Sequence, residues 1–187
     1  MVAQNRGPTA VSETMDVVLR DATCDDLPAI LAIYNDAVLN TSAIWNEATS
    51  DLAGRRAWFD QRTGAGYPVL VAEVGGEIAG YATYGPFRPH DGYRHSAELS
   101  VYVATGRRGA GLGDRLLALL VERARAAGIH VLIGGIEAGN AGSIRLHARH
   151  GFVEAGRLPQ VGAKFGRWLD LVLMQLILDD RPTPGGA

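Results

Sequence analysis

The stretch Arg107-Arg-Gly-Ala-Gly-Leu-Gly113 separates a strand-like segment from a strongly periodic helix-like one. Before it, residues 98–103 carry apolar side chains at every second position, which is typical of a strand. After it, leucines at 112, 116 and 120 repeat every four residues and predict an amphipathic helix that ends at Gly128. Glycines let a backbone approach a ligand closely, and the first turn of a helix presents unpaired N–H groups to an anion. We therefore expect a pyrophosphate to bind here.

The loop has competing interpretations. It could be a glycine-rich turn that binds nothing. A dinucleotide fingerprint fits poorly, because Gly109, Gly111 and Gly113 alternate strictly and the loop lies in the middle of the chain. A nucleoside-triphosphate P-loop requires Lys after its last glycine, and Asp114 stands there instead.

Outward from the loop, strand and helix signals alternate in the second half of the chain, whereas Gly75-Gly76 predicts a hairpin in the first half. The sequence thus predicts an α/β (α+β) fold with one mixed sheet of about six to seven strands, flanked by helices on both faces. The expected strands are 17–20, 68–74, 78–84, 98–103, 129–136, 152–153 and 168–178, and the expected helices are 27–38, 52–59, 112–124 and 140–149.

Composition limits the classes of protein that are possible. The 187 residues carry a formal net charge of −2, which gives no general attraction to nucleic acid or membrane, so we expect neither partner. The single cysteine, Cys24, excludes an internal disulfide and favours a cytoplasmic location. No apolar run is long enough to span a membrane. We expect flexible tails at 1–15 and 180–187 around a single domain at 16–179.

The chain carries three motifs in a fixed order, namely Arg108-x-x-Gly111-x-Gly113, Glu137-x-x-Asn140-x-x-Ser143 and Leu146-His147-x-x-x-Gly151-Phe152. In this order and spacing they resemble the GNAT superfamily of N-acetyltransferases. Segments 33–38, 41–45 and 161–170 are similar to the phosphinothricin and methionine sulfoximine N-acetyltransferase subfamily. The resemblance implies the GNAT fold and acetyl-CoA as co-substrate.

It also implies which residues bind acetyl-CoA. Backbone groups of the strand would contact the pantetheine arm and the thioester, the loop would hold the pyrophosphate, and the helix after the next strand would add polar contacts. The residues so assigned are Val101, Tyr102, Val103, Arg108, Gly109, Ala110, Gly111, Leu112, Gly113, Asp114, Asn140 and Ser143.

Acetylation of an amine requires a general base, because amino groups are mostly protonated near neutral pH. Glu98 is the candidate, since it lies on an otherwise apolar strand just before the loop. His147 stands where many superfamily members carry a tyrosine, and it is a candidate acid for the thiolate leaving group or, alternatively, a packing residue or substrate contact. We expect direct transfer without a covalent intermediate and without a metal.

The expected substrate is a small amino-acid analogue of the phosphinothricin, methionine sulfoximine or methionine sulfone type, acetylated on its α-amino group. Arginines suit its anionic groups and aromatic residues its apolar part. The candidates are Trp45, Arg88, Tyr93, Arg94, Ser96 and Lys164, and we expect a homodimer. Two alternatives stay open: a protein or peptide N-acetyltransferase, and a non-catalytic CoA-binding module.

Overall fold

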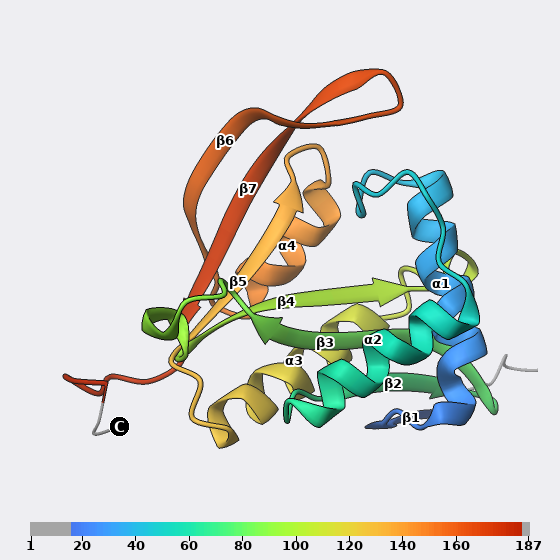
Figure 1. Ribbon diagram of the computed structural model, residues 1–187, viewed down its shortest axis with the longest axis horizontal. Helices are drawn as coiled ribbons and strands as arrows, with labels where there is room; N and C mark the ends of the chain where they lie inside the picture. Colours follow the sequence, from blue (N-terminus) through green and yellow to red (C-terminus); the bar gives the residue numbers. More distant parts are fainter. Residues whose placement is uncertain (1–15, 185–187) are drawn as a thin grey trace, which may run out of the picture.

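A seven-stranded sheet forms the centre of the computed structural model, which describes residues 16–184 (Figure 1). Its strand order is β1-β2-β3-β4-β5-β7-β6. Neighbouring strands are antiparallel except for the parallel pair β4 and β5. The strands are β1 (Val17–Asp21), β2 (Val69–Val74), β3 (Glu77–Pro86), β4 (Ser96–Val103), β5 (Val131–Glu137), β6 (Val153–Lys164) and β7 (Arg167–Ile177).

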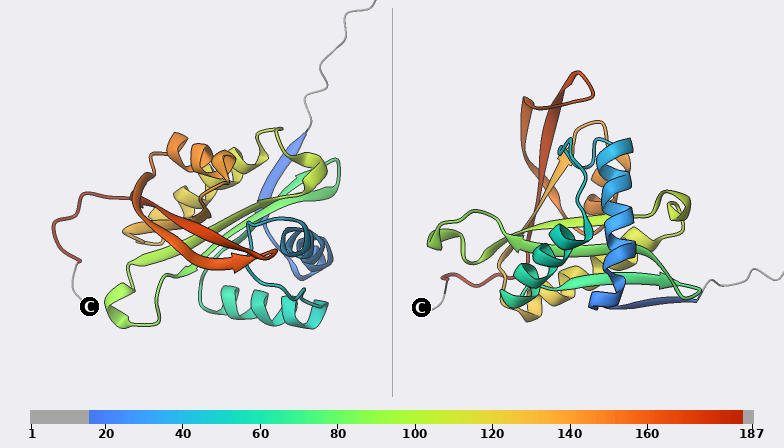
Figure 2. Two further views of the ribbon diagram at one scale, coloured as in Figure 1. Left: turned by 90° about the horizontal axis from the view of Figure 1, so that it is seen from above. Right: turned by 45° about the vertical axis from the view of Figure 1, so that its right-hand side comes forward.

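Helices cover both faces of the sheet, as the sequence predicted. They are α1 (Leu27–Asn40), α2 (Leu52–Gly64), α3 (Leu112–Ala126) and α4 (Ala141–Arg149). Seen from above, α1 and α2 lie on one side of the strands and α3 and α4 on the other (Figure 2). Within residues 16–184, no helix is long and apolar enough to cross a membrane.

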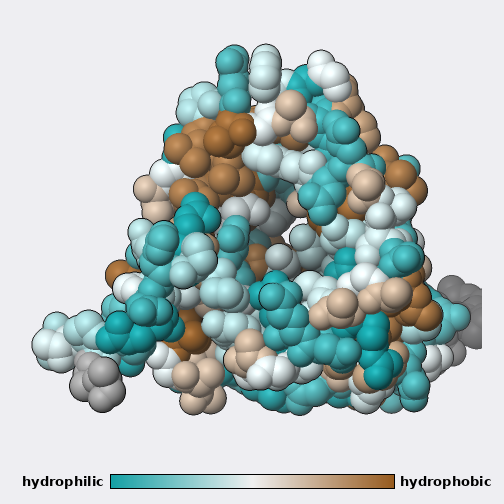
Figure 3. Space-filling model, viewed as in Figure 1, coloured by the Kyte–Doolittle hydropathy of each residue, from teal (hydrophilic) through white to brown (hydrophobic). Residues whose placement is uncertain are grey.

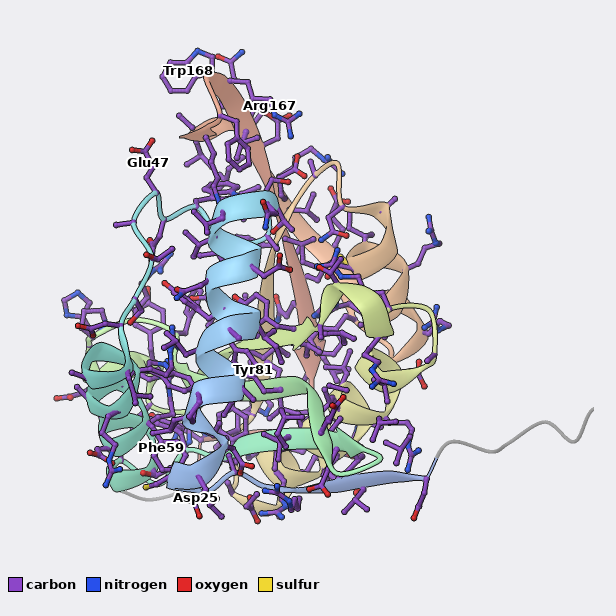
Figure 4. The ribbon with its side chains drawn as sticks, turned by 90° about the vertical axis from the view of Figure 1, so that its right-hand side faces the viewer. Asp25, Glu47, Phe59, Tyr81, Arg167 and Trp168 are labelled. Atoms are coloured by element: carbon purple, nitrogen blue, oxygen red, sulfur yellow. The ribbon has the colours of Figure 1, made fainter. Side chains whose placement is uncertain are left out.

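Apolar side chains hold each pair of layers together. On one face, Leu112, Leu116 and Leu120 of α3 are buried against the strands. On the other face, Phe59 of α2 and Tyr81 of β3 belong to one buried cluster and point into the space between helices and sheet (Figure 4). Each such side chain contributes about 1.5–3 kcal/mol by leaving water. The apolar side chains whose spacing predicted these helices and strands are therefore the side chains that form the two cores.

Short-range contacts fix the turn between β2 and β3 and the chain just before α1 and α2. Gly75 and Gly76 adopt positive φ angles of 60° and 84° in the turn between β2 and β3, a conformation that glycine adopts without strain. The carboxylate of Asp26 accepts a hydrogen bond from the Thr23 amide at 2.7 Å ahead of α1. Asp51 caps α2 by accepting from the Gly54 amide.

The β6–β7 hairpin is much longer than expected. The sequence predicted a strand at residues 152–153 only, whereas β6 continues to Lys164. Most of its side chains are exposed, so it lacks the alternation that a half-buried strand would show. The hairpin rises from the body as an arm (Figure 1). The tails expected at 1–15 and at 185–187 lie outside the described residues.

Candidate active site

The two parallel strands separate in the middle of the sheet. Pairing between β4 and β5 stops at Leu99 and Gly134, while each strand continues along its other neighbour. The opening forms a cleft lined by residues 99–102 and 134–137, with Ala43 and α4 at its sides. Figure 3 shows a hollow in this part of the surface, between the hairpin arm and α1. Of the predicted strand residues, Val101 and Tyr102 line this cleft.

The glycine loop lies beside this opening and leads directly into α3. Gly109 and Gly111 have positive φ angles of 81° and 77°, which explains why glycines stand there. The first helical hydrogen bond runs from the Arg115 amide to the Gly111 carbonyl, so the earlier amides, including that of Gly113, lack helical acceptors. The positive end of the helix dipole adds to these amides. The arrangement suits a diphosphate.

Three charged side chains of the loop have partners within the protein. Arg107 forms an ion pair with Glu77 at 3.0 Å. Arg108 donates its Nε–H to the Val103 carbonyl at 3.3 Å and so stays at the loop. The Asp114 carboxylate accepts hydrogen bonds from Arg149 and His150, which lower its pKa.

Glu98 is close to the point where the strands separate. Its carboxylate Oε1 would lie 3.1 Å from a Cβ at position 135, so Gly135 leaves the space that the side chain occupies. The side chain is reached by solvent, yet the surrounding protein partly desolvates it and raises its pKa, while Arg88 and Arg62 act in the opposite direction. A carboxylate in this setting can accept a proton from an amine.

His147 lies on the opposite face of the sheet and also lines the cleft. It is only 3% exposed, and its ring is packed edge-on against Phe152. Nδ1 lies 2.8 Å from the Ser143 carbonyl, which assigns the proton to Nδ1. Nε2 is buried without a partner among the described residues. Burial lowers the pKa of His147, so the ring is neutral near pH 7.

Two polar residues at the start of α4, Asn140 and Ser143, stabilise its N-terminus. The Asn140 side chain caps the helix by accepting from the Ser143 amide at 3.1 Å. Both residues also line the cleft, so the capping role and a ligand contact are compatible. Glu137, which lies at the same place, accepts a hydrogen bond from Ser42 and thereby connects the loop after α1 to β5.

Two of the predicted substrate residues, Trp45 and Lys164, connect the loop after α1 to the hairpin arm. The Trp45 ring lies against Gly162, where an added Cβ would come within 2.2 Å of it. Lys164 is 3% exposed, and its ammonium donates to the carbonyls of Val38, Thr41 and Ile44. These bonds use all three N–H donors of Lys164. In this structure Lys164 therefore joins the hairpin arm to the loop after α1.

The remaining predicted substrate residues gather between β3 and the start of β4. The Arg88 guanidinium stacks on Phe87, and Tyr93 packs edge-on against the same ring. Arg94 is exposed and bonds to the Asp91 carbonyl. Ser96 begins β4, two residues before Glu98. Of this group, Arg88 is the residue whose charge acts on Glu98.

Sequence reasoning missed three features of the site. Arg62 of α2 lies over Gly85 next to Glu98. Gly134 and Gly135 leave room for His147 and Glu98 on the two faces of β5. A Gly-Gly pair inside a strand signals a close approach by other groups, and it could have drawn attention to this position. The sequence gives no such indication for Arg62, because an arginine in the last turn of a helix is typical of an ordinary surface position.

The sheet that opens between β4 and β5, beside a glycine loop at a helix N-terminus, defines an acyltransferase of the GNAT class. A family model described as an acetyltransferase (GNAT) domain matches residues 19–173, and the chain belongs to this family. It is an N-acetyltransferase. Within residues 16–184, no three His, Cys, Asp or Glu side chains are grouped to hold a metal ion.

Relatives within the family carry more specific names. The chain is 60% identical over 166 residues to the L-methionine sulfoximine/L-methionine sulfone acetyltransferase of Pseudomonas aeruginosa, covering 88% of this chain and 96% of that protein. It is 45% identical to a phosphinothricin N-acetyltransferase of Alcaligenes faecalis, with 89% and 83% covered. A phosphinothricin acetyltransferase structure from Sinorhizobium meliloti, in complex with acetyl-CoA, aligns with a TM-score of 0.87 at 39% identity, with 91% and 95% covered. The resemblance drawn from the sequence motifs is confirmed.

Proposed function

We propose that this protein transfers the acetyl group of acetyl-CoA to the α-amino group of a small amino-acid analogue, of the methionine sulfoximine, methionine sulfone or phosphinothricin type. The observation that carries the proposal is the position of Glu98, a partly desolvated carboxylate beside the opening of β4 and β5. The names of the relatives supply the substrate class.

The residues present fit acetyl-CoA. The pyrophosphate binds the amides at the start of α3, with Arg108 beside them. The pantetheine arm enters the cleft, where the free edges of the separated strands offer backbone hydrogen bonds. The buried, unpaired Nε2 of His147 lines the same cleft and accepts a hydrogen bond from an N–H of the arm.

The chemistry needs no covalent enzyme intermediate. Glu98 takes a proton from the substrate ammonium, and the neutral amine attacks the thioester carbonyl. A backbone N–H of residues 101–103 stabilises the negative charge that develops on the carbonyl oxygen. The nitrogen of the tetrahedral intermediate loses its second proton to solvent, the C–S bond breaks as the amide forms, and the thiolate of CoA gains a proton. A neutral imidazole is a poor proton donor, so His147 serves as an acceptor in this proposal and the proton for the thiolate comes from solvent.

A homodimer formed through the hairpin arm is part of the proposal. The exposed apolar side chains Val153, Leu158, Val161, Phe165 and Trp168 all belong to β6, β7 or their turn. Brown side chains gather over this arm in Figure 3. Trp168 stands at the tip of the arm, away from the body (Figure 4). A second copy would remove this apolar surface from water.

Thiol release from acetyl-CoA tests the function with the unmodified protein. The amines compared are methionine sulfoximine, methionine sulfone, phosphinothricin and a panel of peptides. We expect the highest kcat/KM with one of the three analogues. Turnover confined to peptides would favour a protein acetyltransferase, and acetyl-CoA binding without turnover of any amine would favour a non-catalytic module.

A further inference from the structure

Arg62 reaches from the last turn of α2 to the backbone of β3. A Cβ built on Gly85 would lie 1.2 Å from Nη1 of Arg62 and 2.5 Å from its Cζ, so the guanidinium fills the space that any larger residue would occupy. Gly85 is the register partner of Glu98 across β3 and β4. Directly opposed positions share one face of a sheet, with Cβ positions about 4.5–5.5 Å apart. The guanidinium therefore lies beside Glu98.

This guanidinium forms no ion pair within residues 16–184, although the nearby Glu98 carboxylate acts on it electrostatically. Arginines such as Arg107 and Arg149 form ion pairs with carboxylates, but Arg62 forms none, not even with Glu98. It is half-buried, and burial lowers its pKa. A partly desolvated charge that forms no direct ion pair is costly, and a bound anion would offset that cost.

We propose that Arg62, placed on Gly85, binds the α-carboxylate of the amino-acid substrate and thereby holds its amino group against Glu98. This inference rests on the proposed function. The two groups of an α-amino acid share one carbon atom, so the side chains that receive them must be neighbours. Arg62 and Glu98 meet this condition, because Arg62 lies over Gly85 and Gly85 is the register partner of Glu98. Arg88, on the exposed loop, is left for the polar group at the other end of the substrate.

The test compares methionine sulfone with its carboxamide, which has the same amino group and no carboxylate. A charge-assisted pair in a partly desolvated site gives the wild type a preference for the acid of about 10- to 100-fold in kcat/KM. Arg62→Gln should reduce that ratio toward one, mainly through KM for the acid. KM for acetyl-CoA should not change. Arg56→Gln is the matched control, because Arg56 is on the same helix and its side chain is exposed.

Gly85→Ala provides a second, independent variant. Gly85 is not among the residues with positive φ, so alanine suits the strand, and the atoms in its way belong to the flexible Arg62 side chain. The added methyl should displace the guanidinium and lower the acid-to-amide ratio as Arg62→Gln does. The double variant should be no worse than either single one, since both remove the same contact.

The outcomes separate the two proposals. If the wild type turns over neither compound nor any related amine, the proposed function fails, and the role of Arg62 fails with it. If the wild type acetylates the acid but Arg62→Gln keeps the full preference over the amide, only the assignment of Arg62 is overturned. An equal loss on both compounds would indicate that Arg62 merely supports the structure, and would also overturn it.

Discussion

Glu98 combines two properties that a general base needs, namely a pKa raised by desolvation and a position beside the opening of the sheet. Glu98→Gln keeps the shape and removes the ability to accept a proton. We expect kcat to fall by about 10²- to 10⁴-fold, which is the usual contribution of a positioned base. Acetyl-CoA binding, measured by isothermal titration, should stay the same. A variant that kept the wild-type rate at every pH would remove Glu98 from the mechanism.

The pH dependence follows from the charges around Glu98. Desolvation raises its pKa above the ordinary 4.5, so kcat/KM should fall, as the pH is lowered, at a pH above that value. Arg88→Gln removes a positive charge that favours the carboxylate, and the acid limb of the profile should therefore move to still higher pH. Arg94→Gln is the control, because no effect of Arg94 on Glu98 is resolved. An acid limb that moved downward in Arg88→Gln would contradict this account.

Single residues differ in how far their roles could be predicted. Glu98, Arg108 and Asn140 stand at short spacings from one glycine loop along the chain, so the sequence alone was enough to propose them. Arg62 reaches the site only because α2 packs over β3 and Gly85 has no side chain. The contacts of Lys164 could not be predicted for a similar reason, since its three carbonyl partners lie about 120 residues away in sequence. Long-range packing decides both cases.

At the scale of elements, β5 depends on its two glycines. A Cβ at Gly134 would lie 3.0 Å from the ring of the buried His147, which has little room to move. Gly134→Ala should therefore lower the free energy of unfolding in urea by about 1–3 kcal/mol, as overpacking does. Gly64→Ala is the matched control, because Gly64 ends α2 and a Cβ there meets nothing within 4 Å. Equal stability of the two variants would show that His147 can move aside.

The loop after α1 depends in turn on the hairpin arm. Lys164→Met keeps the length of the side chain but leaves the carbonyls of Val38, Thr41 and Ile44 without their donor. We expect a loss of about 1–3 kcal/mol in stability, together with faster proteolysis of residues 41–46. Arg167→Met, an exposed cation paired with Lys164 across the same hairpin, should have little effect on either measurement. A larger effect of Arg167→Met than of Lys164→Met would contradict the stabilising role of Lys164.

Elements were predictable where they bury one face. The apolar repeat of α3 and the alternation in β4 both arise because one side of each element packs in a core. The β6 strand shows no such pattern, because it is an exposed edge strand. Its register with β7 also shifts between Leu158 and Gly162. A pattern of burial cannot reveal a strand that buries little.

For the whole molecule, the apolar hairpin arm is the feature that packing within one chain does not explain. Trp168 is 68% exposed, and Trp168→Arg should convert the proposed dimer into a folded monomer, because a charge would then enter the apolar interface. Light scattering measures the mass, and circular dichroism checks the fold. Leu52→Arg, an exposed apolar position on α2, is the control and should remain dimeric. A monomeric wild type would exclude this assembly.

The separation of β4 and β5 has a further consequence. Main-chain groups along the separated edges have no strand opposite them, so a linear molecule with amides of its own can occupy the gap as an additional strand would. Recognition of that kind uses main-chain groups of the protein, which are the same whatever side chains the strands carry. The side chains bordering the gap are then free to diverge and to fit different amines, while the donor of the acyl group stays the same.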